Sequence, residues 1–340
     1  MTDRLEENDG HGWRARAVRI VAAFAAAAVL GIGCYWLLEA TEPEGGLVSF
    51  SFLLILPAAV CALACYVADP FGERSAAFYH TMPVWTLGGV TAVAVLFLRE
   101  GLICIILLAP LWFVSALAGA TLAYRLRRRL QRDRTLCCAI ILAPLLAMQL
   151  EPMIPPPEGS YSVARSIVIE AEPARIWPLL RGVPDVQAGE GRWNFSQDLV
   201  GVPRPLGAEL LGEGIGATRL AHWQRGIDFR ERIIEWQPGR RIGWTFDFGG
   251  SQGWHFADRH LRPDSAYFRV TTGGYTLEPL GPGRTRVTLD TRYAIRTPVN
   301  GYSALWGELF LGDLENNLLA MIKQRAERVP QAANASASIE

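Results

Sequence analysis

Residues that hold metals or form disulfides are scarce in this sequence. Its 340 residues include five histidines and six cysteines, and every cysteine lies in the apolar first half. No C-x-x-C pair has partner ligands, and no two histidines have the spacing of a helical zinc site or of a two-histidine, one-carboxylate iron site. We therefore expect no metal site, no disulfide framework and no cofactor. The cysteines are expected to be small, buried apolar side chains.

Net charge is absent as well, because 33 acidic residues balance 33 basic ones. A balanced chain has no overall attraction for polyanions, so no nucleic-acid partner is expected. The charges are distributed unevenly: the first half holds long uncharged runs, whereas the second half has the composition of a soluble domain. The sequence therefore predicts a membrane half followed by a soluble half.

Five apolar segments in the first half are predicted to span a bilayer. A spanning helix needs about 20 apolar residues, a length that residues 17–38, 47–68 and 102–124 reach, whereas residues 83–98 and 135–150 are shorter. No segment carries a central carboxylate, lysine or histidine, which argues against a pump. We expect this half to anchor the chain in the lipid bilayer or to pack against a membrane-protein partner.

The distribution of arginine predicts the orientation. Three arginines flank the first segment and six occupy residues 125–134, whereas the loop 39–46 has acidic residues and no base. Basic loops stay in the cytoplasm, so the protein is expected to be integral to the cell (inner) membrane. We expect residues 135–150 to span the bilayer, which places the soluble half on the extracytoplasmic side; it would be cytoplasmic if these residues lie in the interface.

The soluble half begins after a Pro-rich spacer, residues 151–160, which is stiff and extended. Residues 161–173 then alternate like a strand and residues 173–182 form a short helix. About six strands follow, joined by short turns, and a long helix over 300–329 closes the domain. Residues 329–340 are expected to be a disordered tail.

One glycine-rich stretch, GEGIGATRLAHW at residues 212–223, fits G-x-G-x-x-A, a variant of the dinucleotide-binding fingerprint. That fingerprint needs a following helix whose N-terminus holds the pyrophosphate. Here the chain alternates like a strand after Gly216 instead. The glycines are therefore predicted to form a tight hairpin, and nucleotide binding is not expected.

The order of elements and several motifs resemble the SRPBCC superfamily, which includes START-like, Bet v 1-like, polyketide cyclase and lipid-transport proteins. The matching segments are the entry strand and helix at 166–180, the hairpins at 212–219, 229–244 and 273–293, and the closing helix at 300–328. This resemblance covers residues 161–328. It implies an α+β helix-grip domain, a curved antiparallel sheet around a long C-terminal helix, preceded by an all-α transmembrane region. The fold does not fix the function, because members carry lipids, bind hormones or catalyse cyclisation.

In this fold the apolar stripe of the closing helix faces a cavity. Leu311, Leu314, Leu318 and Ile322 form such a stripe at spacings of three and four. The predicted ligand-binding residues, all large and apolar or aromatic, are Trp244, Phe246, Phe248, Leu289, Tyr293, Trp306 and Phe310. The same side chains would also suit a solid core, an alternative that the sequence leaves open.

Three polar residues are the candidates for catalysis. His255 and His260 lie in an expected loop, where either is a general acid/base if it faces the cavity mouth, or a solvated side chain if it does not. Glu231 shares a strand face with Phe229 and Ile233, so it is expected to point inward and to need an arginine partner. It is then either a structural ion pair or a catalytic or ligand-anchoring group.

Three functions follow, in order of preference. The first is a membrane-anchored module that binds a lipid or another hydrophobic small molecule. The second is an enzyme of the polyketide cyclase/dehydratase type, acting on a hydrophobic substrate. The third is a structural or regulatory membrane protein with a filled core.

Overall fold

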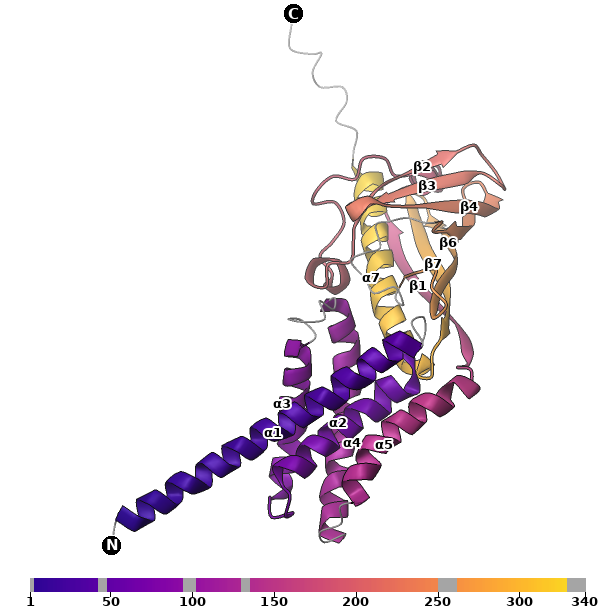
Figure 1. Ribbon diagram of the computed structural model, residues 1–340. Coiled ribbons are helices and arrows are strands. Elements are labelled where there is room, and N and C mark those ends of the chain that lie inside the picture. Colours follow the sequence, from indigo (N-terminus) through magenta and orange to yellow (C-terminus); the bar gives the residue numbers. More distant parts are fainter. Residues whose placement is uncertain (1–2, 42–47, 94–101, 130–134, 250–261, 329–340) are drawn as a thin grey trace, which may run out of the picture. The chain divides into compact units, whose positions relative to one another are not determined.

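Two compact units make up the chain, and each has its own hydrophobic core. The helical unit contains Met1–Pro157 with Thr297–Val299, and the sheet unit contains Glu158–Arg296 with Asn300–Glu340. The structure is a computed structural model (Figure 1), and it describes residues 3–41, 48–93, 102–129, 135–249 and 262–328.

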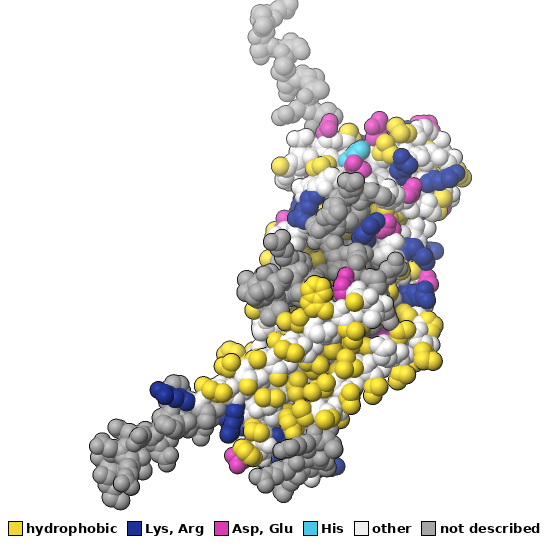
Figure 2. All heavy atoms as spheres, in the orientation of Figure 1, with side chains coloured by type: hydrophobic (Ala, Val, Ile, Leu, Met, Phe, Trp, Pro, Cys, Tyr) yellow, Lys and Arg dark blue, Asp and Glu magenta, His cyan; other side chains and the backbone are white. Residues whose placement is uncertain are grey.

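The helical unit consists, in its described residues, of α1 (Asp3–Thr41), a π-helical turn (Ser51–Ile55) that continues into α2 (Leu56–Ala68), α3 (Ala76–Val93), α4 (Leu102–Arg129), α5 (Thr135–Leu150) and a final 3₁₀ turn (Glu151–Met153). Three helical stretches in these residues are long and apolar enough to cross a membrane: Ala17–Thr41, Ser51–Ala68 and Ile105–Arg129. A shorter apolar helix covers Cys137–Met153. On the face shown in Figure 2, hydrophobic side chains cover the helical unit, whereas charged side chains are spread over the sheet unit. The predicted all-α apolar region is thus present, and three of its five predicted spans have the length and composition to cross a membrane. That any of the five spans the bilayer stays a prediction.

The helices of this unit pack closely where small residues meet. A Cβ atom on Gly119 of α4 would lie 2.1 Å from the backbone oxygen of Ala58 on α2. Only a glycine permits this approach, which is the way membrane helices commonly come together. The packing of α2 against α4 therefore depends on this position.

Polar contacts at the helix ends fix which ends lie on the same side of the helical unit. Arg127, near the end of α4, donates to the backbone oxygen of Asp69, just after α2, at 2.9 Å. Glu151, just after α5, accepts from the backbone N–H of Ser51, at the start of the π-helical turn that leads into α2, at 2.8 Å. Helix α5 therefore ends on the side opposite to the arginine-rich end of α4.

The sheet unit follows the predicted order of strand, short helix, six strands and long helix. Its elements are β1 (Glu158–Ile169), α6 (Pro173–Arg181), a π-helical turn (Phe195–Leu199), β2 (Pro205–Leu211), β3 (Thr218–Trp223), β4 (Ile227–Gln237), β5 (Arg241–Asp247), β6 (Phe268–Gly281), β7 (Arg284–Arg296) and α7 (Asn300–Glu327). The strands form a single antiparallel sheet in the order β1-β7-β6-β5-β4-β3-β2. Figure 1 shows α7 lying along the curved sheet, which confirms the helix-grip fold.

The glycine-rich stretch is a hairpin turn between β2 and β3. Gly212, Gly214 and Gly216 have φ angles of +85°, +85° and +90°, in the region that favours glycine. Strand β3 begins at Thr218, and no helix follows that could hold a phosphate group. The prediction of a turn is confirmed.

The side chains between the sheet and α7 form two groups, and Phe246 packs against both of them. The first, which we call the aliphatic cluster, contains Ile169, Ile176, Leu180, Ile233, Ile242, Trp244, Tyr275, Leu277, Val287, Leu289, Leu319, Ile322 and Ala326. The second, the aromatic cluster, contains Val163, Phe248, Val270, Tyr293 and Ile295, with Tyr161, Phe229, Phe246, Phe268 and Leu311 packed against it. Helix α7 contributes Leu311 to one cluster and Leu319 to the other, so the border between them crosses the middle of the helix.

Candidate functional site

Five of the predicted ligand-binding residues come together on the inner face of the sheet: Trp244, Phe246, Phe248, Leu289 and Tyr293. The rings of Phe246 and Phe248 stack at 5.5 Å, and that of Trp244 lies 5.4 Å from that of Tyr275. These residues are buried or, in the case of Phe246, half-buried. They provide one wall that is apolar and largely aromatic.

The other two predicted ligand-binding residues lie elsewhere. Trp306 and Phe310 stack on each other at 5.8 Å. With 3.6 residues per turn, they lie on the side of α7 turned away from Leu311 and Leu319, which pack toward the sheet. The structure therefore does not bring them together with the five residues of the sheet, and a role in binding stays a prediction.

The catalytic candidate Glu231 points inward and is paired with an arginine. Its carboxylate accepts from Nε of Arg219, and both side chains are almost completely buried. Arg219 also donates to the backbone oxygen of Leu180 at 2.6 Å and lies over the ring of Trp244 at 4.1 Å. Burial by itself would lower the pKa of Arg219, but Glu231 outweighs that effect and raises it. The two opposite charges neutralise each other on the inner face, and a catalytic or ligand-anchoring role for Glu231 stays a prediction. The other two candidates, His255 and His260, lie outside the described residues.

Glu315, which is not among the candidates from the sequence, lies at the border between the two clusters. It belongs to α7, one turn from both Leu311 and Leu319, and it is 2% exposed. By distance and angle, neither of its carboxyl oxygens has a hydrogen-bond partner in the described part of the chain, and the Thr291 hydroxyl beside the carboxyl acts on it only weakly. Burial raises the pKa of Glu315 to about 8, and the neighbouring Thr291 and Arg165 offset only part of that effect. Glu315 is therefore mostly neutral at pH 7.

A second unpaired group lies on the same level of the sheet. Thr291, Gly273 and Trp244 are direct neighbours across β7, β6 and β5. A Cβ atom on Gly273 would lie 2.9 Å from the indole ring of Trp244, so the ring extends over this glycine toward β7. Its buried Nε1–H has no acceptor among the described residues. We call Glu315, Thr291 and the Trp244 indole N–H the polar seam.

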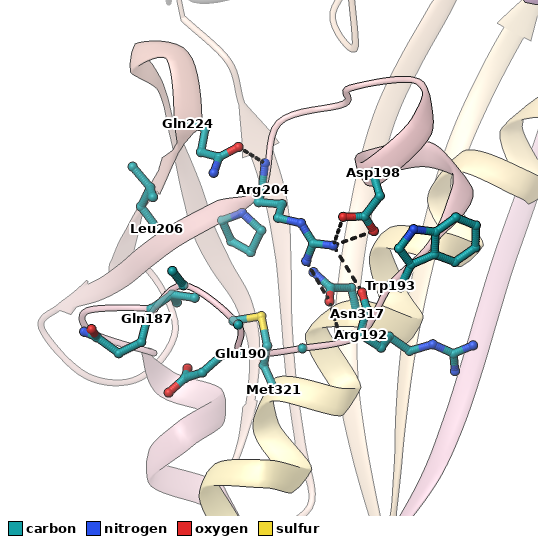
Figure 3. A pocket seen from close by; sticks show the side chains of 15 residues that line it. Gln187, Glu190, Arg192, Trp193, Asp198, Arg204, Leu206, Gln224, Asn317 and Met321 are labelled. Atoms are coloured by element: carbon teal, nitrogen blue, oxygen red, sulfur yellow. Dashed lines mark hydrogen bonds and ion pairs between the residues drawn. The ribbon is translucent and has the colours of Figure 1, made fainter.

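A pocket of about 400 Å³ lies between α7 and the edge strand β2 (Figure 3). Its walls come from the irregular segment after α6, the start of β2, and Asn317 and Met321 of α7. Two of its lining residues, Arg204 and Asp198, form an ion pair at 2.7 Å, and a third, Glu190, is bound to Arg325 at 2.9 Å and to Arg328 at 3.3 Å. The sequence of this segment indicates only irregular structure, so the pocket was not predicted.

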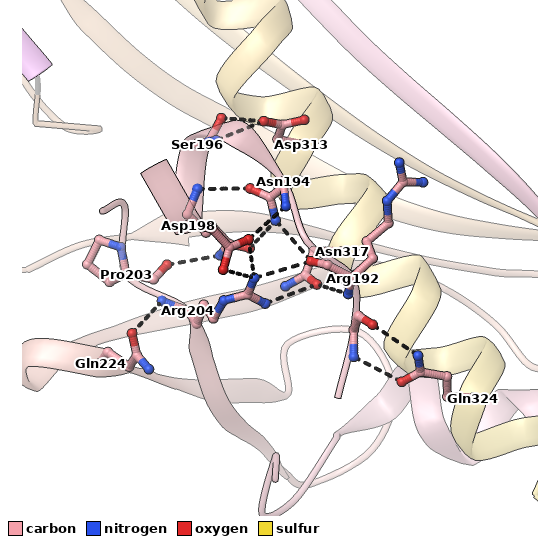
Figure 4. Close-up of polar contacts among 12 residues, drawn as sticks. Arg192, Asn194, Ser196, Asp198, Pro203, Arg204, Gln224, Asp313, Asn317 and Gln324 are labelled. Carbon is pink, nitrogen blue, oxygen red and sulfur yellow. Dashed lines mark hydrogen bonds and ion pairs between the residues drawn. The ribbon is translucent and has the colours of Figure 1, made fainter. Parts of the chain in front are cut away.

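A hydrogen-bond network supports the wall of this pocket (Figure 4). Asn317, 1% exposed, accepts at Oδ1 from the backbone N–H of Arg192 at 2.8 Å and from Arg204 at 3.3 Å. Gly191, with a φ angle of +91°, permits this contact, because a Cβ atom there would lie 2.1 Å from Asn317 Oδ1. The backbone N–H of Asn194 and the guanidinium of Arg204 together hold the pKa of Asp198 below its usual value. These contacts hold the loop against α7.

The chain is similar to known proteins over the sheet unit. Residues 160–327 match the family described as polyketide cyclase / dehydrase and lipid transport. Among solved structures, a truncated norcoclaurine synthase from Thalictrum flavum is similar over 51% of this chain and 97% of its own length, with 14% identity and a TM-score of 0.31. The Zhui aromatase/cyclase from Streptomyces sp. R1128 is similar over 49% of this chain and 94% of its own, with 14% identity and a TM-score of 0.31. A protein from Chromobacterium violaceum is similar over 48% and 96%, with 18% identity and a TM-score of 0.26. The comparison with curated proteins gives no match.

Proposed function

Because residues 160–327 are a domain of the polyketide cyclase / dehydrase and lipid transport family, we propose that this protein is a membrane-anchored module that binds a lipid or another hydrophobic small molecule between its sheet and α7. The observation that carries the proposal is the polar seam. An apolar, aromatic interior with a few polar groups inside it is the usual make-up of a small-molecule site.

The polar seam argues against a filled core. Buried polar groups in native proteins almost always have hydrogen-bond partners, and leaving one without a partner costs about 1–3 kcal/mol. Both carboxyl oxygens of Glu315 and the indole N–H of Trp244 lack partners among the described residues. A bound molecule with one polar group would supply these partners, whereas a structural module with a filled core has no use for them.

The apolar helices of the helical unit support the anchoring role. We propose that the arginine-rich end of α4 faces the cytoplasm. Since Glu151 holds the end of α5 at the start of the π-helical turn before α2, the sheet unit would then leave the membrane on the extracytoplasmic side. Tethering beside a bilayer raises the local concentration of a ligand that comes from the membrane.

Native mass spectrometry on residues 158–330, purified without detergent, tests this proposal. These residues contain the whole sheet, α6, α7 and both clusters. We expect a reproducible added mass, and extraction should identify it as an apolar compound with at least one oxygen. A clean apo mass, together with no uptake from a panel of phospholipids, fatty alcohols and aromatic ketones, would refute ligand binding and favour the filled core.

Catalysis is the second candidate, and one observation favours it. A buried carboxyl group that keeps its proton at pH 7 is suited to general acid catalysis. If the protein is an enzyme of the cyclase/dehydratase type, the extracted compound should be converted on incubation, and Glu315→Gln should abolish conversion while the compound still binds. Recovery of the compound unchanged from the wild-type protein would exclude this candidate.

A further inference from the structure

The hydrogen-bonding groups of the polar seam restrict the kind of ligand that it can bind. Resting on the proposed function, we propose that the Glu315 carboxyl and the Trp244 indole N–H bind a carbonyl or hydroxyl oxygen of an uncharged hydrophobic ligand. The ligand would be a ketone, ester or alcohol rather than a carboxylic acid or an amine.

The geometry brings these two groups to one place. Glu315 enters from α7 at the border between the aliphatic and aromatic clusters. Thr291 of β7 lies beside its carboxyl, and Gly273 separates Thr291 from Trp244 in the same row of the sheet. Because Gly273 has no side chain, the indole ring of Trp244 covers it and extends toward β7. Both unpaired groups therefore lie on one level of the interior, with apolar walls on either side.

The hydrogen-bonding capacity of the seam defines the ligand atom. An indole N–H only donates, and a protonated carboxyl group donates through its O–H and accepts through its carbonyl oxygen. A ketone oxygen can accept from both groups. An alcohol can accept from Trp244 and donate to Glu315. A pure hydrocarbon would leave both groups unpaired, at a cost in affinity.

The charges around Glu315 disfavour ionic ligands. Arg165 is the cation that acts on its carboxyl, but the guanidinium of Arg165 is bound to Glu308 at 2.7 Å. Arg219, over the ring of Trp244, is bound to Glu231. A carboxylate ligand would thus meet a second carboxyl group without an unpaired arginine beside it in the described part of the chain. An amine would meet the Glu315 carboxyl, which keeps its proton, and the Trp244 N–H, which only donates, so neither group would pair with a cation.

The remaining groups that face Glu315 keep it neutral. The titratable or charged groups on the elements packed against it are Arg165 of β1, Asp290 of β7, Tyr275 of β6, and Glu308 of α7 itself. Asp290 is bound to Arg241 at 2.9 Å and, like Glu308, disfavours a further negative charge. Burial also raises the pKa of Tyr275, so its hydroxyl keeps its proton. The carboxyl of Glu315 loses its proton only near pH 8 and above.

Four naphthalene probes of similar size separate the ligand classes: 2-acetylnaphthalene, 2-ethylnaphthalene, 2-naphthoate and 2-(2-aminoethyl)naphthalene. Binding to the full chain in nanodiscs is measured by equilibrium dialysis against empty nanodiscs, at pH 6.5 and pH 9.5. At pH 6.5 we expect 2-acetylnaphthalene to bind about tenfold more tightly than 2-ethylnaphthalene, as one or two hydrogen bonds would provide. At pH 9.5 this preference should fall at least threefold, because the carboxyl has lost its O–H donor.

Variants identify the groups responsible. Glu315→Leu should remove the preference for the ketone, and Trp244→Phe, which keeps a ring but lacks the N–H, should reduce it about threefold. Glu209→Gln is the matched control, because Glu209 lies on β2, at the far edge of the sheet from β7, and a change there should have no effect. If Glu315→Leu fails to fold, Trp244→Phe and the pH dependence of the wild-type protein still decide the question.

Each outcome has a defined meaning. No binding of any probe would refute the proposed function itself. Equal binding of the ketone and the hydrocarbon, or a preference that survives in Glu315→Leu, would leave ligand binding intact and overturn this inference. Tightest binding of the amine, increasing between pH 6.5 and 9.5, would also overturn it, because it would indicate an ionised Glu315 that pairs with a cation. Tightest binding of 2-naphthoate would also overturn this inference, because it would show that the site prefers an anion to a neutral ligand.

Discussion

Glu315→Gln should stabilise the sheet unit at alkaline pH and leave it almost unchanged near pH 4. The carboxyl is 2% exposed and has no hydrogen-bond partner among the described residues. Burial therefore disfavours its charged form, whereas the amide of glutamine is neutral at every pH. The difference between wild-type and variant isolates the free energy needed to ionise this one group inside the fold.

The magnitude follows from the difference between the pKa values of Glu315 in the unfolded and folded states. Burial raises this pKa from 4.5 to about 8, and a tenfold change in a proton-binding constant corresponds to about 1.4 kcal/mol. Between these two pKa values the folded state keeps a proton that the unfolded state has lost, so the stability of the wild-type protein falls as the pH rises. The full loss, about 5 kcal/mol, is reached above pH 8. It is an upper bound, because water entering the seam would lower it.

Urea unfolding of residues 158–328, freed of bound ligand and followed by circular dichroism from pH 4 to pH 9, measures this difference. We expect the free energies of unfolding of wild-type and Glu315→Gln to diverge from about pH 4.5 and to run parallel again above pH 8. Glu209→Gln, the same chemical change on β2 at the far edge of the sheet, should follow the wild-type curve. Parallel curves for wild-type and Glu315→Gln over the whole range would refute the reasoning.

Three further predictions concern other parts of the chain. Arg219→Met should lower the free energy of unfolding of the sheet unit in urea by about 3 kcal/mol, because it leaves Glu231 buried without a partner. The double variant Arg219→Met/Glu231→Leu should recover part of this loss. Equal losses in the single and double variants would contradict this reasoning. Gly119→Ala should lower the thermal stability of the full chain in detergent, whereas Gly88→Ala, which has open space around it, should not; a similar change in both would show that the close approach is unimportant. A reporter enzyme that is active only outside the cytoplasm, fused after Glu340, should be active, and activity of a cytoplasmic reporter at that position would contradict the proposed topology.

Much of the fold could be predicted because its pattern is local. Alternation of apolar and polar residues indicates a strand, and closely spaced glycines before such a segment indicate a turn, without any knowledge of what lies across the sheet. For this reason the order of strands and helices, the turn at Gly212–Gly216 and the inward direction of Glu231 were all accessible. For the partner of Glu231 the sequence predicts only the residue type, an arginine. It does not identify Arg219, because Arg219 lies on a different strand.

The site was less predictable because it depends on which residues meet across elements. Trp306 and Phe310 are aromatic, as residues of a cavity wall often are. Their angular position around the axis of α7, however, places them on the side that faces away from the sheet. Glu315 carries a signal in the sequence that could have identified it. It follows Leu311 by four residues and precedes Ile322 by seven, so it interrupts an apolar stripe with a charged residue.

The polar seam connects stability and binding in one group. Glu315 lowers the stability of the empty protein increasingly between pH 4.5 and 8, since its carboxyl is held where burial favours only the neutral form. Replacing it with an apolar residue would remove that cost and would lose at most the weak interaction with the Thr291 hydroxyl. A ligand that accepts its O–H would add a hydrogen bond inside the fold and so stabilise the folded state by mass action. If the proposed ligand binds there, the position would act against stability in the empty state and in favour of it in the bound state, as a binding group would and a structural one would not.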